Sequence, residues 1–260
     1  MSLLRNSLLA GLLALLAACH SAPVDAPGDV PGADAARQTK LGLMSSLPLY
    51  WPLGADIAAI AGGNAALPWQ RQALERDFTL EPLDTLSPIP ALSPDALDTD
   101  PLEGFTHLAV IQPRGLSPAD NVALDDWVRG GGHLLLVLDP ALTGDYDLPL
   151  GDPRRPVDTA LILPVVGRWG LAVSFDEAQT AAVIQSRLGE ATLPLGLPGR
   201  IVITDPAAAN CTLLADSAAA RCGVGAGQVT LIADAALFEH PELAGEGGVA
   251  LRGVVRAALE

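Results

Sequence analysis

A single unit at residues 107–139 constrains the fold more than any other part of this sequence. Residues 108–111 and 134–138 are two continuous apolar runs. Between them, Ser117 stands at an N-cap position directly before Pro118, and the three glycines at 130–132 end the intervening helix. Two buried strands joined by a helix lie parallel to each other and are connected with a right-handed crossover. The unit therefore predicts a parallel sheet that is covered on both faces.

The helix of this unit has an apolar and a polar side. The apolar side carries Ala123, Leu124, Trp127 and Val128. The polar side carries Asp120, Asp125, Asp126 and Arg129. We expect the apolar side to pack on the sheet and the polar side to face water, with Asp125 and Arg129 paired across one helical turn.

Short apolar runs alternate with helical segments along the rest of the chain. Strands are expected at residues 41–44, 78–83, 171–175, 200–204 and 228–234, and helices at 55–61, 69–76, 159–169 and 248–259. The last helix is amphipathic, with Leu251, Val254, Val255 and Leu259 inward and Arg252 and Arg256 outward. This alternation is typical of the α/β class with a mostly parallel central sheet.

The first residues have the pattern of an export signal. Arg5 precedes an uncharged run at residues 8–18, which is shorter than the roughly 20 residues that a membrane-spanning helix needs. The sequence Leu-Ala-Ala-Cys at 16–19 resembles the lipobox of bacterial lipoproteins, and this resemblance implies a lipid on Cys19. An uncleaved anchor or an ordinary signal with a chance cysteine is the alternative.

Three segments follow from this pattern. Residues 1–18 are interpreted as a lipoprotein signal peptide and residues 19–39 as a flexible tether rich in Pro, Ala, Gly and Asp. Residues 40–260 are expected to form one domain, because they suffice for one large core but not for two.

Charge and cysteine content narrow the partners and the compartment. The net charge of −15 repels phosphate backbones, so a nucleic-acid partner is not expected. Cys211 and Cys222 remain besides Cys19, and in an oxidising compartment such a pair predicts a disulfide, with two reduced thiols as the alternative. Residues 212–215 are expected to pair with the segment around Cys222.

Several segments together resemble a known family. They are residues 109–112, Ser117, Leu-Asp-Asp-Trp-Val at 124–128, the three glycines, residues 134–140 and residues 227–238. They resemble the periplasmic domain of gliding-motility-type ABC transporter accessory proteins. For residues 40–260, this resemblance implies the fold of class I glutamine amidotransferases, a flavodoxin-like three-layer sandwich, without the catalytic cysteine.

No catalytic template is complete in the sequence. Residues 238–242 contain His240-Pro-Glu242, a tripeptide that amidotransferases of this class use for catalysis. Their nucleophile is a cysteine on a strand-to-helix elbow, and the expected strand ends at 112–114 and 139–141 carry no thiol. The four histidines have no metal-ligand spacing, and no nucleotide-binding loop is present. We therefore interpret His240-Pro-Glu242 as a surface turn and expect no catalytic residue, cofactor or metal.

Polar residues at the carboxyl ends of the expected strands define a possible ligand edge. They are Ser45, Ser46, Gln112, Arg114, Asp139 and Asp234. Capping and loop hydrogen bonds are the alternative role for each of them. Arg154 and Arg155 are adjacent cations that could clamp an anion, or could instead neutralise Asp152 and Asp158.

The sequence thus predicts a non-enzymatic lipoprotein module of the bacterial cell envelope, facing the periplasm. Its expected partners are the membrane, through the lipid on Cys19, and a protein of an ABC-type transport or envelope assembly system. The alternative is a hydrolase or transferase of the amidotransferase-like fold, with a site around Asp139, Asp234 and His240. A hydroxyl, thiol or metal beside a general base at the sheet rim would overturn the non-enzymatic hypothesis.

Overall fold

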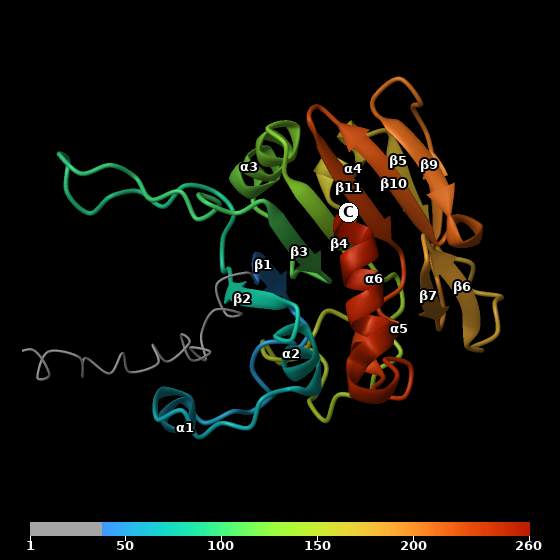
Figure 1. Ribbon diagram of the computed structural model, residues 1–260, viewed down its shortest axis with the longest axis horizontal. Coiled ribbons are helices and arrows are strands. Elements are labelled where there is room, and N and C mark those ends of the chain that lie inside the picture. Colours follow the sequence, from blue (N-terminus) through green and yellow to red (C-terminus); the bar gives the residue numbers. More distant parts are fainter. Residues whose placement is uncertain (1–37) are drawn as a thin grey trace, which may run out of the picture. The chain divides into compact units, whose positions relative to one another are not determined.

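A seven-stranded sheet forms the centre of the computed structural model, which describes residues 38–260 (Figure 1). Its order is β2-β1-β3-β4-β11-β10-β9. The parallel strands are β1 (Thr39–Ser45), β2 (Phe78–Pro82), β3 (His107–Ile111), β4 (His133–Val137) and β11 (Gly227–Ile232). Antiparallel β10 (Ala219–Val224) and β9 (Asn210–Leu214) complete one edge. The expected α/β class with a largely parallel central sheet is confirmed.

The crossover unit forms as predicted. Strands β3 and β4 are parallel, with His107 opposite His133. Helix α3 (Pro118–Arg129) connects them and begins with a capping box. The Ser117 hydroxyl accepts a hydrogen bond from the Asp120 N–H, and the Asp120 carboxylate accepts one from the Ser117 N–H. The helix therefore starts at Pro118, where the sequence placed it.

Two hydrophobic cores lie on opposite faces of the sheet. In β4, Leu135 and Val137 belong to one core, while Leu134 and Leu136 belong to the other. The first core is covered by α2 (Trp69–Leu74) and α6 (Val249–Leu259), and the second by α3 and α4 (Pro164–Arg168). Figure 1 shows α6 in front of the strands and α4 behind them. This two-sided burial explains why the β4 sequence is continuously apolar.

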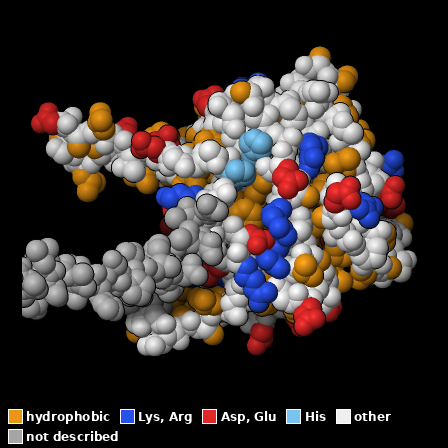
Figure 2. Space-filling view, in the orientation of Figure 1, with side chains coloured by type: hydrophobic (Ala, Val, Ile, Leu, Met, Phe, Trp, Pro, Cys, Tyr) orange, Lys and Arg blue, Asp and Glu red, His pale blue; other side chains and the backbone are white. Residues whose placement is uncertain are grey.

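The outward side of α6 is basic, as predicted. Lys and Arg side chains gather over this helix in the view of Figure 2. Arg252 and Arg256 both contact Asp77, at 3.0 and 3.3 Å. These ion pairs connect α6 to the turn after α2.

The expected polar side of α3 is wrong for two of its four residues. Asp120 and Asp125 are 9% and 1% exposed. Residues 85–87 cover Asp120 and donate hydrogen bonds to it, whereas α4 and Trp169 cover Asp125. The Trp169 indole N–H donates a hydrogen bond to Asp125 at 2.8 Å. The predicted pair of Asp125 and Arg129 is confirmed at 3.0 Å.

Two small antiparallel sheets lie outside the central one. Strand β5 (Leu171–Ser174) pairs with β8 (Arg200–Ile203), and β6 (Ile184–Leu188) pairs with β7 (Ala191–Leu195). The sequence predicted β5 and β8 but missed the β6–β7 hairpin. The expected helix at 159–169 is shorter, because Pro164 has no N–H to continue a helix and begins α4 instead.

The remaining elements are short. They are α1 (Ile57–Ala61), α5 (Ala236–Glu239) and the 3-10 turns at Ala215–Ser217 and Glu246–Gly248. Between β2 and β3, the chain forms a long arm that extends away from the sheet (Figure 1). Residues 38–260 form one compact unit, in which no helix combines the length and apolarity needed to cross a bilayer. The signal peptide, Cys19 and most of the expected tether lie outside the described residues.

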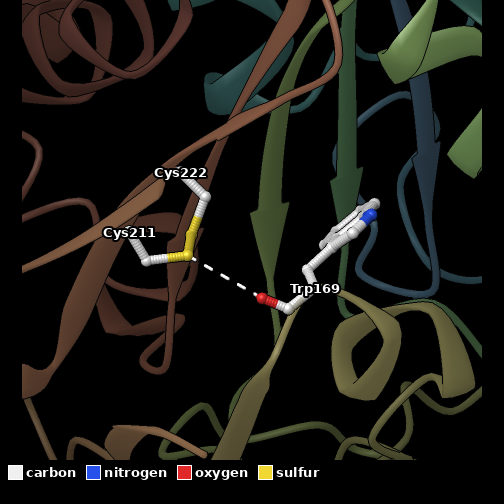
Figure 3. The surroundings of a disulfide bond; sticks show 3 residues. All are labelled: Trp169, Cys211 and Cys222. Carbon is white, nitrogen blue, oxygen red and sulfur yellow. Dashed lines mark hydrogen bonds between the residues drawn. A yellow bond between two sulfur atoms is a disulfide. The ribbon is translucent and has the colours of Figure 1, made fainter. Parts of the chain in front are cut away.

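The predicted disulfide between Cys211 and Cys222 is present. The two residues are direct neighbours across β9 and β10, so the expected pairing of these segments is also confirmed. The Sγ atom of Cys211 lies 3.9 Å from the carbonyl oxygen of Trp169 (Figure 3). The bond thus fixes the edge strand to the sheet beside the second hydrophobic core.

Candidate functional site

Two buried carboxyl groups lie where neighbouring parallel strands end. Asp139 follows β4 and Asp234 follows β11, and these strands are adjacent in the sheet. The two residues are 1% and 3% exposed. The sequence assigned both to a ligand edge, and the structure brings them together at that edge.

Asp139 joins two segments of backbone. One carboxylate oxygen accepts a hydrogen bond from the Ala141 N–H and the other accepts one from the Ala235 N–H, both at 2.7 Å. Burial raises the pKa of Asp139 to about 7, and the nearby charge of Asp234 adds to the rise. The carboxyl group of Asp139 is therefore only partly ionised at neutral pH.

Asp234 makes a similar connection on the other side. Its carboxylate accepts hydrogen bonds from the Ala236 and Gly196 N–H groups, both at 2.8 Å. Burial raises the pKa of Asp234 to about 6, although these backbone hydrogen bonds act in the opposite direction. Together, Asp139 and Asp234 hold the ends of β4, β7 and β11 at fixed positions.

A third carboxylate, Glu239 of α5, extends the cluster toward the surface. It accepts hydrogen bonds from the Thr143 N–H at 3.0 Å and from the Tyr146 hydroxyl at 2.6 Å. Burial and the hydrogen bond to Glu239 raise the pKa of Tyr146 far above its ordinary value. Tyr146 is therefore a hydrogen-bond donor at every physiological pH.

This acid cluster has no cationic partner among residues 38–260. Of the ion pairs there, none joins a Lys or Arg to Asp139, Asp234 or Glu239. The raised pKa values of Asp139 and Asp234 reduce the negative charge of these two groups, and N–H and O–H groups donate hydrogen bonds to all three carboxylates. Titratable groups that are perturbed in this way by burial concentrate at functional sites.

A hydroxyl group and an imidazole lie next to each other at the same edge. Thr143 Oγ1 is 2.9 Å from His240 Nε2 and 3.3 Å from a carboxylate oxygen of Glu239. The other ring nitrogen of His240 is 3.5 Å from Glu242 Oε1. This order of hydroxyl, imidazole and carboxylate is the arrangement in which a weak nucleophile can be activated.

Thr143, His240 and Glu242 all line one pocket of about 310 Å³. Its complete lining is Thr143, Ala181, Ala182, Val183, Gly196, Ala236, His240, Glu242 and Leu243. The pocket has the size of a small-molecule site. A ligand in it would meet the hydroxyl–imidazole pair directly, whereas Asp139 and Asp234 are not among the lining residues.

The other residues of the predicted ligand edge do not line the pocket that contains Thr143 and His240. Ser45 and Ser46 line a separate pocket of about 240 Å³, and Ser45 and Arg114 line another of about 230 Å³. Gln112 is fully buried with a positive φ of 45°. Its side-chain amide donates to the carbonyl groups of Asp139 and Val157. Gln112 therefore supports the loop that carries Asp139 and is not accessible to a ligand.

The two adjacent arginines do not converge on an anion site. Arg154 pairs with Asp152 and Arg155 with Asp158, each at 2.7 Å. Arg155 also donates hydrogen bonds to the carbonyl groups of Tyr146 and Leu148. The structure thus has the alternative arrangement, in which the arginines neutralise neighbouring aspartates and hold the loop. Within residues 38–260, no three side chains are grouped to hold a metal ion.

No family model matches the sequence, and no curated protein matches it. Among solved structures, the chain is similar to the exo-beta-1,4-mannosidase Op5Man5 from Opitutaceae bacterium strain TAV5, at 17% identity and a TM-score of 0.46. It is also similar to the beta-galactosidases from Bacillus circulans sp. alkalophilus and Rahnella sp. R3, both at 12% identity, with TM-scores of 0.46 and 0.41. These matches cover 87%, 85% and 76% of this chain, but only 36%, 30% and 29% of the enzymes.

Two expectations are corrected by these findings. The expected resemblance to gliding-motility-type accessory proteins and their amidotransferase-like domains is wrong: no family model matches the sequence, and the similar solved structures are glycosidases. The prediction of a non-enzymatic transporter accessory module is corrected too. The similar solved structures are enzymes, and the rim holds a hydroxyl next to an imidazole, the kind of arrangement that was expected to overturn this prediction. The glycosidases' own substrates are not transferred to this chain.

Sequence reasoning missed three residues of the site: Thr143, Tyr146 and Glu239. Thr143 and Tyr146 belong to the loop after β4, which has no regular pattern. The signal that was present is His240-Pro-Glu242, which was interpreted as a surface turn. Its histidine is half-buried and faces the threonine hydroxyl.

Proposed function

We propose that this protein is a hydrolase that uses Thr143 as nucleophile and His240 as general base. The observation that carries this function is the 2.9 Å separation of Thr143 Oγ1 and His240 Nε2 on the wall of a pocket. Glu242 lies on the other side of the imidazole, with its Oε1 3.5 Å from His240 Nδ1, which is the place of the carboxylate in a hydroxyl–imidazole–carboxylate triad.

The chemistry that suits this arrangement is the hydrolysis of an ester. Thr143 Oγ1 attacks the carbonyl carbon, and its proton passes to His240 Nε2. His240 then returns that proton to the alcohol oxygen as the carbon–oxygen bond breaks, leaving an acyl group on Thr143. Water, deprotonated by His240, attacks this acyl group, and the proton goes back to Thr143. The net reaction converts one ester and one water into an acid and an alcohol.

The acid cluster behind the pocket positions these two side chains. Glu239 accepts a hydrogen bond from the Thr143 N–H and belongs to the same short helix that precedes His240. Asp139 holds the Ala141 and Ala235 N–H groups, one on each side of the site. The threonine loop and the histidine turn are therefore tied together through carboxylates, and rigid support of this kind favours a productive geometry.

The first test removes each partner of the pair. Thr143→Val and His240→Gln should each lower the hydrolysis of p-nitrophenyl esters by at least about 10⁴-fold, as the loss of a member of a catalytic triad does. Thr143→Ser should retain activity, because it keeps the hydroxyl group. His107→Gln is the matched control, because His107 lies at the opposite end of the strands.

A second test identifies the nucleophile. An aryl phosphonate should attach to Thr143, which mass spectrometry of the peptide containing residue 143 would detect. Unchanged hydrolysis in Thr143→Val and His240→Gln, with folding verified by circular dichroism, would show that the pair is only structural.

We also propose a finer fold and a cellular setting. The order β2-β1-β3-β4-β11 matches the 2-1-3-4-5 order of flavodoxin-like sandwiches, in which ligands bind beyond the carboxyl ends of the strands. The lipobox-like residues 16–19 support a hydrolase that is lipid-anchored in the cell envelope. A mass measurement of the mature N-terminus tests this setting, because an unmodified Cys19 would contradict it.

A further inference from the structure

The walls of the His240 pocket are small and apolar. Five of its nine lining residues have aliphatic side chains: Ala181, Ala182, Val183, Ala236 and Leu243. They come from the segment before β6, from α5 and from the turn after α5. An aliphatic group that replaces water against these side chains gains free energy in proportion to the apolar area it covers.

The charge around the pocket has a single sign. Among the lining residues, Glu242 is the acidic one, and none is Lys or Arg. Directly behind the lining, Glu239 contacts Thr143 and Asp234 holds the Gly196 N–H. An anionic group of a ligand in this pocket would be repelled by these carboxylates, because no Lys or Arg lines the pocket to compensate its charge.

The volume of the pocket sets the length of the ligand. At about 310 Å³, it is at the lower end of the range for small-molecule sites. It therefore suits a short aliphatic chain and leaves no room for a long lipid tail.

We propose that the acyl group bound in this pocket is a short, uncharged aliphatic chain, and that anionic acyl groups are excluded. This inference rests on the proposed hydrolase function, since it names the substrate class of the same site.

The test compares two esters that differ only at the far end of the acyl chain. They are p-nitrophenyl hexanoate and the mono-p-nitrophenyl ester of adipic acid, which has a carboxylate in place of the last methyl group. We expect kcat/KM to be at least about tenfold higher for the hexanoate, which corresponds to ~1.4 kcal/mol. The hexadecanoate should be hydrolysed more slowly than the hexanoate, because its chain exceeds the pocket.

Two substitutions make the comparison specific to the pocket. Val183→Arg places a cation on the aliphatic wall and should reverse the preference in favour of the adipate. Val202→Arg is the matched control, because Val202 is similarly exposed on β8 and lies outside the pocket lining. Equal rates for the two esters, or the same change in both variants, would overturn the inference while the hydrolase function stands.

A binding measurement separates the two proposals if no ester is hydrolysed. Ligand-observed NMR compares hexanamide with adipic acid monoamide in the wild-type chain and in Val183→Arg. Selective binding of hexanamide that Val183→Arg reverses would support the ligand class and refute the hydrolase. Absence of selective binding would overturn the ligand class as well.

Discussion

Two pairs of buried aspartates in this protein have almost the same exposure and opposite electrostatic environments. Asp120 and Asp125 lie on helix α3, and Asp139 and Asp234 lie at the rim of the sheet. Asp125 contacts two arginines, Arg129 and Arg168, each at 3.0 Å. No arginine or lysine of residues 38–260 forms an ion pair with the rim aspartates.

The pKa values follow this difference. Burial acts to raise the pKa of Asp125, but hydrogen bonds from Arg129 and Trp169 outweigh it and leave the pKa lowered. Burial likewise opposes the hydrogen bonds that lower the pKa of Asp120. At the rim, burial dominates and raises both values. Helix α3 therefore uses its acids to hold structure, whereas the rim keeps acids that can exchange protons near neutral pH.

The largest predicted effect is on the pH dependence of stability. A carboxyl group whose pKa is raised by folding contributes its full stability at low pH, where it is protonated in both states, and loses it as the pH rises through the folded-state value. Asp139 and Asp234 have folded-state pKa values of about 7 and about 6. The free energy of unfolding should therefore fall between pH 4 and pH 7, by on the order of 6 kcal/mol for the two groups together. Urea unfolding across this range measures it.

Other groups act outside this window or against it. The lowered pKa values of Asp120 and Asp125 stabilise the folded state. This contribution is lost only when the carboxylates are protonated at acid pH, below the range of the measurement. The lowered pKa of His107 makes stability rise as the pH increases through neutrality, so His107→Gln is the appropriate background. A free energy of unfolding that stays constant or rises from pH 4 to pH 7 in this background would show that burial does not raise the pKa values of Asp139 and Asp234.

The second prediction removes Asp125, the buried aspartate whose charge is balanced by two arginines. Asp125→Ala should lower the free energy of unfolding by about 3 kcal/mol, because it leaves the buried Trp169 indole N–H without an acceptor. The loss of the ion pairs with Arg129 and Arg168 should lower the free energy of unfolding by less, because both arginine side chains reach solvent. Asp126→Ala, on the exposed side of the same helix, should change stability by less than about 0.5 kcal/mol. Equal effects of the two substitutions in urea unfolding would contradict the distinction between the two sides.

The sequence predicted the parts of the fold that depend on local pattern. The apolar runs around α3, the Ser117 cap and the inward residues of α6 follow from periodicity and capping alone. The burial of Asp125 could not be predicted in this way, because it depends on Trp169, forty-four positions along the chain. The β6–β7 hairpin was missed because its strands combine exposed polar residues with a proline at 194.

The candidate site was predictable in its position but not in its chemistry. Asp139 and Asp234 were identified because residues after parallel strands meet at one edge. The pairing of Thr143 with His240 joins positions ninety-seven residues apart, and no spacing in the sequence indicates it. His240-Pro-Glu242 was visible, but its role depends on the hydroxyl that the fold places beside it.

The third prediction concerns the cap of α3. Ser117→Ala removes the hydroxyl that accepts the Asp120 N–H and donates to the Asp120 carboxylate. The free energy of unfolding should fall by about 1 kcal/mol, which is typical for the loss of an N-cap. Ser93→Ala, at an exposed position of the arm, is the control and should have no measurable effect. An unchanged thermal midpoint for Ser117→Ala would show that Asp120 is held by its other donors alone.

The smallest predicted effect tests whether the rim acids act on one another. The charge of Glu239 contributes to the raised pKa of both Asp139 and Asp234. In Glu239→Gln, the side-chain carbonyl can still accept the Thr143 N–H, while the Tyr146 hydroxyl can turn to accept from the new amide. The pKa of Asp139 should then fall by roughly half a unit, or ~0.7 kcal/mol. Carbon-13 NMR titration of the carboxyl groups measures this shift, with Glu246→Gln, an exposed acid after α5, as the control. If the Asp139 titration does not move in Glu239→Gln, the charge of Glu239 does not act on Asp139, and the coupled part of the rim is limited to Asp139 and Asp234.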